Sequence, residues 1–275
     1  MDLTGRRFLI TGAGTGIGRG VALTLAHLGA DVGLHYSHNS DGAESAAAEI
    51  RAMGRNAVTA KADLSDVDQA LALAATIAKG LDGLDGVVNN AGITMNRPFL
   101  DTTPEQYDML FNVNVRGMYF VTQSAARIMI AAGGGTVVNI SSVHAYTAMV
   151  EHSVYAATKA AIVGFTRTLS VELIQAGVRV NCVASGWVLV ESQREALKLD
   201  DTFNEVEAAK ILPAGFIGTG SDIGNLVAFL STDASRYIIG QTVACDGGQV
   251  ALMPATPSFR EPTTVQYGRN YVPGL

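Results

Sequence analysis

The stretch that decides the fold is RRFLITGAGTGIG, at residues 6–18. A short apolar run at 8–10 is typical of a buried strand, and it leads into a turn with glycine at every second position from 12 to 18. Apolar side chains then recur at the spacing of one helical face, at Ile17, Val21, Leu25 and Leu28. The stretch therefore predicts a strand, a tight turn and a helix, the repeating unit of parallel α/β sheets.

The same alternation continues along the chain. Further strand-like runs, with helical patterns between them, lie at 31–37, 56–63, 84–92, 136–141, 178–185 and 241–248. One helix start is marked by Thr103 as N-cap, Pro104 at the first helical position and Gln106 three residues after the cap. This pattern predicts one α/β domain over residues 1–252, doubly wound, with a seven-stranded, mostly parallel sheet and helices on both faces.

Two segments break the alternation. The polar stretch at 187–213 is too long for a simple connection, and we expect it to form a mobile helical lid. The tail at 253–275 carries four of the seven prolines, so it cannot be a regular helix or a central strand. We expect the tail to be a Pro-rich extension outside the domain.

Composition narrows the class of protein. Of the 275 residues 48% are hydrophobic, and the net charge of −6 argues against a nucleic-acid surface, which needs a basic stripe. No apolar run approaches the roughly 18 residues of a membrane span, and the N-terminus shows no signal peptide. Cys182 and Cys245 lie in strand-like runs, and the His and Cys spacing matches no zinc site. We expect a cytoplasmic globular protein with no metal, no membrane and no nucleic acid.

The glycine turn points to a ligand. Glycines at a strand–helix junction let the backbone approach a pyrophosphate, which the helix N-terminus stabilises. The strict G-x-G-x-x-G spacing is absent, and no Lys-Ser/Thr pair follows as in a P-loop. A plain tight turn is the alternative, but the position of the turn after the first strand favours dinucleotide binding.

A second candidate site lies at 141–159, SSVHAYTAMVEHSVYAATK. Tyr155 and Lys159 are four residues apart in a helical pattern, so they share one face, and a fixed ammonium stabilises a phenolate. Ser142 ends a strand-like run, which would hold its hydroxyl rigidly beside the phenol. Taken alone, such a pair is more often surface packing. It becomes an acid/base site only if a substrate and a cofactor are brought to it.

Several motifs together resemble those of the short-chain dehydrogenase/reductase family, over roughly residues 3–249. They are TGAGTGIG at 11–18, Asp63-Leu64, NNAG at 89–92, Asn114, Ser142, Tyr155 with Lys159, and DGG at 246–248. The resemblance implies a Rossmann fold, an NAD(P)-dependent oxidoreductase acting on alcohols and ketones, and assembly as a homotetramer through the helices that carry Asn114 and Tyr155.

The resemblance also implies residue roles. Tyr155 would be the general acid/base, Lys159 would assist it and bind the nicotinamide ribose, Ser142 would orient the carbonyl, and Asn114 would hold a water of a proton relay. Asn90 and Gly92 would line the cofactor ribose and Asp63 the adenine. The implied cofactor-binding set is completed by Gly12, Thr15, Gly16, Ile17, Gly18, Tyr36, Ser37, His38, Leu64, Ala91, Gly186 and Val188.

Two positions depart from the family pattern. Ser185-Gly186 stands where the family usually has Pro-Gly, and Val190 stands where a Thr usually contacts the nicotinamide carboxamide. The turn is expected to be less rigid, and one cofactor hydrogen bond is expected to be lost or supplied by backbone, for instance at Val188.

The residues at the end of the second strand indicate whether NAD or NADP is the cofactor. An acidic residue there usually bonds the ribose 2′-hydroxyl of NAD and repels the phosphate of NADP. No carboxylate stands between Tyr36 and Asp41, while Ser37 and His38 can hydrogen-bond a phosphate. No Arg or Lys is present there, and Thr15 stands where NADP users often have a basic residue. On balance NADP(H) is favoured over NAD(H).

Few residues indicate the class of substrate. His144 follows Ser142 by two residues, and family position adds Asn96, Glu151, His152 and Trp187 to the pocket. These polar groups favour a sugar, a polyol or a related hydroxy/keto compound.

Two other functions stay open. A 3-oxoacyl (acyl-carrier) reductase of lipid synthesis shares the motifs, and a non-catalytic redox sensor would bind the dinucleotide alone. The tail at 253–275 would either contact a neighbouring subunit or be a loosely ordered terminus.

Overall fold

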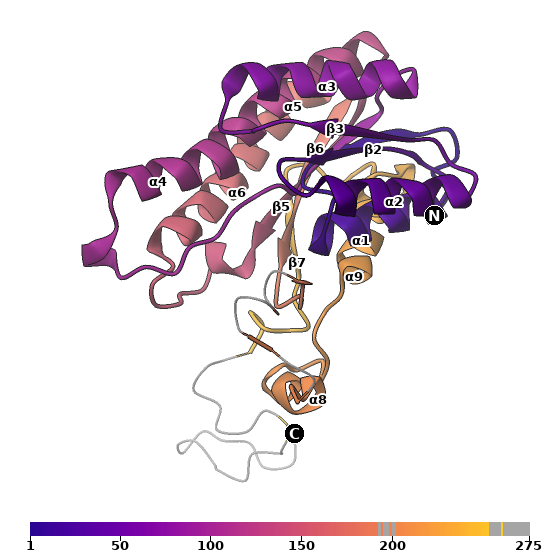
Figure 1. Cartoon of the computed structure of the whole chain (residues 1–275). Helices are drawn as coiled ribbons and strands as arrows, with labels where there is room; N and C mark the ends of the chain where they lie inside the picture. The colour runs from indigo at the N-terminus through magenta and orange to yellow at the C-terminus, as the bar shows by residue number, and fades with distance from the viewer. Residues whose placement is uncertain (192–193, 195–197, 200–201, 253–259, 261–275) are drawn as a thin grey trace, which may run out of the picture.

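The computed structural model describes the chain except residues 192–193, 195–197, 200–201, 253–259 and 261–275 (Figure 1). Within the described residues, seven strands form one sheet in the order β3-β2-β1-β4-β5-β6-β7, and every neighbouring pair is parallel. The strands are β1 (Arg7–Ile10), β2 (Asp31–Tyr36), β3 (Ala57–Lys61), β4 (Gly86–Asn89), β5 (Gly135–Ser142), β6 (Val178–Ser185) and β7 (Thr242–Cys245). The predicted doubly wound α/β sheet is confirmed.

Helices cover both faces of the sheet (Figure 1). On one face lie α1 (Gly16–His27), α2 (Ser40–Ala52) and α9 (Gly220–Leu230), and on the other lie α3 (Val67–Leu81), α5 (Met118–Ala131) and α6 (Ser153–Leu173). Shorter elements are η1 (Phe99–Asp101), α4 (Pro104–Phe111), η2 (Asn112–Gly117), η3 (Val143–Ala145), η4 (Ile174–Ala176), α8 (Glu205–Ala208), η5 (Ala209–Ile211) and η6 (Asp233–Ser235).

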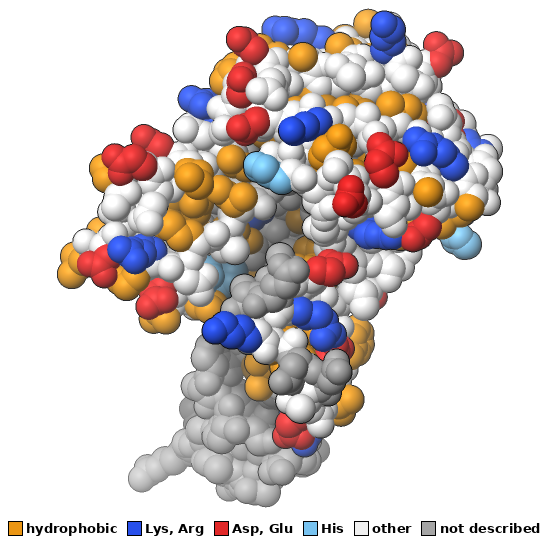
Figure 2. All heavy atoms as spheres, in the orientation of Figure 1, with side chains coloured by type: hydrophobic (Ala, Val, Ile, Leu, Met, Phe, Trp, Pro, Cys, Tyr) orange, Lys and Arg blue, Asp and Glu red, His pale blue; other side chains and the backbone are white. Residues whose placement is uncertain are grey.

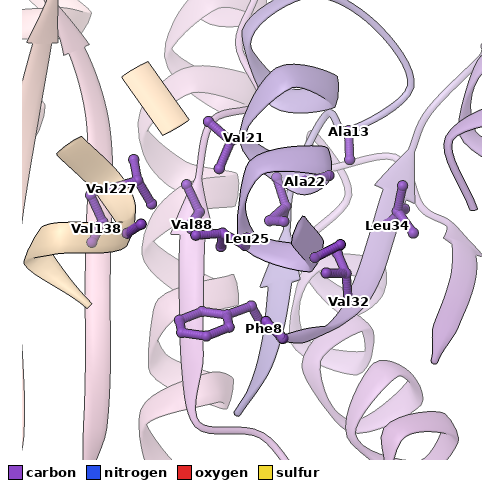
Figure 3. Packing of buried hydrophobic residues seen from close by; sticks show 14 of the residues in the cluster. Phe8, Ala13, Val21, Ala22, Leu25, Val32, Leu34, Val88, Val138 and Val227 are labelled. Atoms are coloured by element: carbon purple, nitrogen blue, oxygen red, sulfur yellow. The ribbon is translucent and has the colours of Figure 1, made fainter. Parts of the chain in front are cut away.

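Two hydrophobic clusters, one on each face of the sheet, form because successive side chains of a strand point to opposite faces. In β1, Phe8 and Ile10 pack in the cluster under α1 and α9, while Leu9 packs in the cluster under α3 and α5. Figure 3 shows Phe8 below Leu25 of α1, with β4 beside it. Because both faces of every central strand are covered, the strands read as continuous apolar runs, which is why the sequence pattern revealed them.

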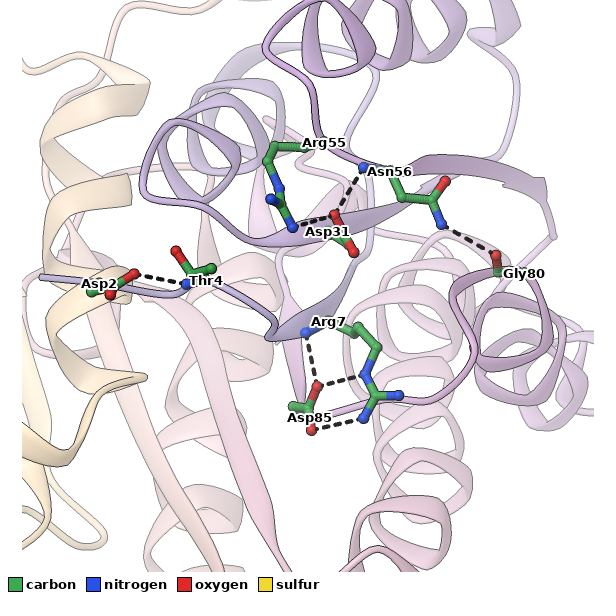
Figure 4. A network of polar contacts seen from close by, with 8 residues as sticks. All are labelled: Asp2, Thr4, Arg7, Asp31, Arg55, Asn56, Gly80 and Asp85. Atoms are coloured by element: carbon green, nitrogen blue, oxygen red, sulfur yellow. Dashed lines mark hydrogen bonds and ion pairs between the residues drawn. The ribbon is translucent and has the colours of Figure 1, made fainter.

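Ion pairs lie at the amino ends of the strands (Figure 4). The Arg7 side chain meets Asp85 with Nε 2.7 Å from Oδ2, and the backbone N–H of Arg7 donates to the same oxygen at 2.9 Å. Arg55 Nη2 lies 2.8 Å from Asp31 Oδ1. These pairs join the first residues of β1 and β2 to the loops before β4 and β3, at the edge of the sheet opposite to the glycine turn.

The helix predicted from Thr103 onward begins as expected. Thr103 and Gln106 form a reciprocal capping box, with Pro104 as the first residue of α4. The helical backbone continues into α5, but residues Asn112–Gly117 form a π-helical turn between α4 and α5. Such turns insert one extra residue per turn and often occur at functional sites.

The predicted lid and tail are described only in part. Within 187–213 the described residues include the short α8 and η5, so part of the segment is helical, as expected. The tail lies outside the described residues except at Arg260, whose Nη2 donates to the carbonyl oxygen of Leu212 at 2.8 Å. The tail therefore contacts the end of the lid segment within the same chain at this point.

Candidate active site

The carboxyl ends of the parallel strands bring the predicted site residues to one edge of the sheet. The glycine turn follows β1, Asn90 follows β4, Ser142 ends β5 and Gly186 follows β6. The strand order reverses between β1 and β4, and a crevice at that point is where ligands bind in open α/β sheets. In Figure 2 the surface is hollowed between the part that carries α2 and the part that carries α4.

The glycine turn has the geometry of a backbone cradle. Gly12 and Gly16 have φ of +65° and +55°, in the left-handed region that favours glycine. A Cβ on Gly18 would lie 2.1 Å from the carbonyl oxygen of Gly12, so no side chain fits there. The turn therefore presents bare backbone to a ligand, directly before the N-terminus of α1, which is the fit expected for a diphosphate.

Asn90 and Thr11 hold the turn in place. Asn90 Nδ2 donates to the carbonyl oxygens of Thr11 and Gly12 at 3.0 and 3.1 Å. The hydroxyl oxygen of Thr11 accepts from the backbone N–H groups of Asn90 and Ala91, each at 3.0 Å. The amide nitrogen of Asn90 is thus committed to the turn and supports it from the end of β4.

His35 is a site residue that the sequence did not reveal. Its ring is 2% exposed, Nδ1 accepts from the N–H of Gly12 at 3.1 Å, and Nε2 lies 3.0 Å from the carbonyl oxygen of Ala62. A neutral ring with its proton on Nε2 satisfies both contacts. Burial lowers its pKa, although the bond to Ala62 opposes this shift. The only signal was a histidine at a buried position of an apolar strand.

The predicted adenine side lies at the ends of β2 and β3. Tyr36 and Ser37 are half-buried and His38 is exposed, while Leu64 is buried. The exposed Asp63 accepts from both the hydroxyl and the backbone N–H of Ser65, and these bonds lower the pKa of its carboxyl group.

Lys159 is buried and fixed to β5. Its side chain is 5% exposed, Nζ donates to the carbonyl oxygen of Ile140 at 3.0 Å, and Nζ lies 5.6 Å from the ring centroid of Tyr155. The Ser141 hydroxyl donates to the backbone carbonyl of Lys159 at 2.8 Å. Two bonds therefore join the start of α6 to the end of β5, which brings the predicted phenol and ammonium together.

Ser142 is buried at the end of β5, and its hydroxyl oxygen accepts from the N–H of His144 at 3.2 Å. A hydroxyl that accepts from the backbone keeps its own proton for another partner. Ser142 can therefore donate to an oxygen placed in the crevice.

Asn114 lies in the π-helical turn, and its amide group makes three hydrogen bonds to the protein, which leave one acceptor site on Oδ1. Its Oδ1 accepts from the N–H of Ile93 at 2.8 Å, and its Nδ2 donates to the Ile93 carbonyl at 2.9 Å and to the Thr158 hydroxyl at 3.1 Å. Thr158, which the sequence did not reveal, donates to the Tyr155 carbonyl at 2.7 Å. The Cβ position of Gly92 lies 3.2 Å from Asn114 Oδ1 and 3.6 Å from Lys159 Nζ, so both groups border one small space.

Three rings form a cluster at the start of α6. His144 and His152 stack with centroids 5.2 Å apart, and Tyr155 lies edge-on to them at 5.7 and 6.0 Å. His152 Nδ1 lies 3.0 Å from the Val150 carbonyl, so this nitrogen carries a proton and leaves Nε2 as an acceptor in the neutral ring. Burial, and then the neighbouring His152, lowers the pKa of His144, which keeps it neutral at pH 7.

Two loops border this cluster. The Arg97 N–H donates to the Glu151 carbonyl at 2.9 Å, which ties the loop carrying Asn96 to the loop carrying His152. Asn96 and Glu151 are both exposed. Glu151 adopts φ +65°, which marks a tight bend directly before the buried His152.

Ser185 and Val190, the two residues that depart from the family pattern, both make contacts within the protein. The Ser185 hydroxyl donates to the Ser141 carbonyl at 3.3 Å, which adds a bond between β5 and β6 where the family usually has proline. A Cβ on Gly186 would lie 2.5 Å from Asp246, so only glycine fits there. Val190 packs on Gly16 of the glycine turn, with Cγ1 3.0 Å from the Cβ position of that glycine.

A cavity of about 160 Å³ is lined in part by residues from the two ends of the lid segment. Trp187, Val188, Phe216 and Cys245 help to line it, and its lining does not include Ser142, Tyr155 or Lys159. The structure therefore places Trp187 at this cavity and not in the ring cluster. Within the described residues no helix is long and apolar enough to cross a membrane, and no group of three potential metal ligands was found.

The fold and the site define a dinucleotide-binding α/β oxidoreductase. A family profile described as Enoyl-(Acyl carrier protein) reductase matches residues 12–249. L-rhamnose 1-dehydrogenase (NAD(P)(+)) of Sphingomonas sp. is 34% identical over 90% of this chain and 96% of its own. A 3-oxoacyl-(acyl-carrier-protein) reductase of Staphylococcus aureus is 35% identical over 87% and 96%. The chain belongs to the short-chain dehydrogenase/reductase family, and it is an NAD(P)-dependent oxidoreductase acting on CH–OH and C=O groups.

Solved structures agree with this assignment. A structure from Beutenbergia cavernae, described as a candidate NAD(P)-dependent gluconate 5-dehydrogenase with bound NADP, has a TM-score of 0.83 and 35% identity, covering 91% of this chain and 99% of its own. Acetoin dehydrogenase of Enterobacter cloacae has a TM-score of 0.84 and 32% identity, covering 93% and 99%.

Proposed function

We propose that the enzyme transfers a hydride between NADP(H) and a secondary alcohol or ketone of a small polar substrate, a sugar, a polyol or a related hydroxy/keto compound. The observation that carries the substrate class is the ring cluster, which puts the imidazole rings of His144 and His152 beside Tyr155. Ring nitrogens hydrogen-bond hydroxyl groups, whereas an acyl chain would need an apolar wall. Similarity to a rhamnose dehydrogenase and to a candidate gluconate dehydrogenase supports the same class.

The chain's own residues handle the proton. When bound, the nicotinamide supplies or accepts the hydride. Tyr155 gives its phenolic proton to the carbonyl oxygen during reduction and takes the alcohol proton during oxidation. Ser142, whose oxygen already accepts from His144, donates to the same substrate oxygen and orients it. Lys159 stabilises the phenolate by its charge and uses its remaining N–H groups for the ribose.

Asn114 completes the catalytic set by holding a water for a proton relay to Lys159. The support is the space beside Gly92 that both side chains border. Asn114 also fixes the loop after β4 through Ile93.

Residues at the carboxyl edge of the sheet would hold the cofactor. The turn formed by Gly12, Thr15, Gly16, Ile17 and Gly18 would hold its diphosphate. The adenosine end would be held by Tyr36, Ser37, His38, Asp63 and Leu64. The nicotinamide ribose side would be held by Asn90, Ala91, Gly92, Gly186 and Val188. The absence of a carboxylate between Tyr36 and Asp41 supports the preference for NADP(H).

The exposed apolar residues of α4, α5 and α6 support a homotetramer formed through these helices. They include Tyr107, Tyr119 and Val171, which are 46%, 46% and 71% exposed. The domain covers residues 1–252, and the tail at 253–275 contacts a neighbouring subunit. Light scattering of the full chain and of a chain ending at Leu252 tests both statements.

One assay separates the proposal from its alternatives. Purified enzyme is offered polyols, aldoses, hydroxy acids, hydrophobic alcohols and a 3-oxoacyl thioester, each with NAD(H) and NADP(H), and the nicotinamide absorbance is followed. We expect turnover of a polyol or sugar and a higher kcat/KM with the NADP form. Turnover restricted to the thioester would favour the acyl-carrier reductase. The Staphylococcus aureus reductase is about as similar in sequence to this chain as the rhamnose dehydrogenase is. Cofactor binding without any turnover would favour a redox sensor.

A further inference from the structure

The residue after Val190 reaches the glycine turn. Glu191 is an exposed residue in the segment after β6, and its Oε2 accepts a hydrogen bond of 3.0 Å from the backbone N–H of Gly16. Val190 packs on the same glycine. The start of the lid segment therefore lies over the first residue of α1, although the two residues are 175 positions apart in sequence.

The N-terminus of α1 has a physical reason to attract this carboxylate. The first N–H groups of a helix have no partner within the helix, and the helix dipole gives that end a partial positive charge. Thr15, the N-cap residue, makes no side-chain cap bond to the helix. Glu191 supplies the missing acceptor from another part of the chain.

Two other acidic side chains that the structure describes in this segment have cationic partners. Glu205 pairs with Arg194, and Glu207 lies 2.6 Å from Lys210. Glu191 instead meets a backbone N–H in the turn. Its carboxylate is the only anion that the described structure brings to Gly16.

We infer that Glu191 competes with the cofactor diphosphate for the start of α1, and that cofactor binding displaces its carboxylate. The inference rests on the proposed use of the glycine turn for the dinucleotide. Carboxylate and diphosphate carry the same sign of charge and seek the same donors, so they exclude each other there. Glu191 then lowers cofactor affinity and offers a replacement anion when the spent cofactor leaves.

Equilibrium binding tests this role without requiring turnover. The dissociation constants of NADPH and NADH are measured by fluorescence titration for the wild type, Glu191→Gln, Glu191→Asp and Glu207→Gln. Glu191→Gln removes the charge, and Glu191→Asp keeps the charge on a side chain that is one methylene too short for the contact. Glu207→Gln is the matched control, because it removes one exposed carboxylate from the same segment.

We expect Glu191→Gln to bind the preferred cofactor about two- to fivefold more tightly, the range for one charge at a helix end. Glu191→Asp should gain affinity too, and Glu207→Gln should match the wild type. Unchanged or weaker binding by Glu191→Gln, or an equal gain in Glu207→Gln, would overturn the inference while leaving the proposed function intact. Absence of cofactor binding in all four proteins, the wild type included, would overturn the proposed function and the inference with it.

Discussion

The ammonium of Lys159 donates to the carbonyl oxygen of Ile140 at 3.0 Å, which fixes a buried charge between α6 and the end of β5. An ammonium has three N–H groups, and this bond uses one of them. The rest of the charge faces the space beside Gly92 and the ring of Tyr155. The position of Lys159 is therefore set by the sheet, before any cofactor or substrate binds.

Replacing this lysine should remove the charge without removing the phenol. We expect Lys159→Met to lower kcat/KM by about 10²-fold or more, within the range for losing an acid/base partner. NADPH binding should weaken as well, because the ribose loses a donor. Lys79→Met, an exposed lysine in the last turn of α3, serves as the control and should behave like the wild type. Full activity in Lys159→Met would contradict this assignment.

His144 should set the KM for a hydroxylated substrate. We expect His144→Gln to raise KM about tenfold with a smaller change in kcat, because a lost substrate hydrogen bond costs roughly 1–1.5 kcal/mol. The pKa of His144 is lowered by burial and by His152, so the ring stays neutral at pH 7 and is protonated only below the ordinary value of about 6.5.

The pH profile checks the same residue independently. In the wild type, KM should be level from pH 8 to pH 6.5 and should rise only at lower pH, as the ring gains a proton and loses an acceptor. In His144→Gln this acidic rise should be smaller. A KM that already rises near pH 7.5, or identical profiles for the two proteins, would count against the role.

His35 should make the fold sensitive to acid. Its pKa is depressed by burial in the folded chain, so below pH 6.5 the unfolded chain binds a proton that the folded chain does not. The contribution of His35 to the free energy of unfolding is therefore fully present above about pH 6.5. It falls as the pH falls, by at most about 1.4 kcal/mol per pH unit. Thermal unfolding from pH 8 to pH 5 should show a shallower dependence in His35→Gln. Parallel curves for the two proteins would refute the prediction.

The ion pair between Arg7 and Asp85 should stabilise the fold without affecting catalysis, because it lies at the amino edge of the sheet, opposite to the site (Figure 4). Asp85 accepts from the backbone N–H of Arg7 and from two guanidinium nitrogens. We expect Asp85→Asn to cost about 2 kcal/mol and to lower the midpoint of thermal unfolding by roughly 5 °C. At 25 °C its kcat/KM should equal that of the wild type, and a selective loss of kcat would show that this edge reaches the site.

Local patterns explain what could be predicted from the sequence. Strands buried on both faces read as apolar runs, and the capping box at Thr103 and Gln106 lies within four residues, so these features needed no tertiary information. Parallel pairing then brings the glycine turn, Asn90 and Ser142 to one edge. That these groups share one site was implied by the family resemblance of the motifs.

Long-range contacts explain what could not be predicted. His35 binds Gly12 across 23 positions, Thr158 binds Asn114 across 44, and Glu191 binds Gly16 across 175. None of these residues stands out by type or spacing in its own segment. The π-helical turn at 112–117 was also missed, because its sequence reads as ordinary helix between α4 and α5.

The measurement that tests the central claim most directly is single-turnover hydride transfer by Tyr155→Phe, compared with Tyr146→Phe. Tyr146 is an exposed tyrosine on the neighbouring loop, so it controls for the loss of a phenolic hydroxyl near the site. With a polyol or sugar substrate, Tyr155→Phe should still bind NADPH but should transfer the hydride about 10²- to 10⁴-fold more slowly. Tyr146→Phe should match the wild type. A Tyr155→Phe enzyme that keeps the wild-type rate would contradict the assignment of Tyr155 as the general acid/base.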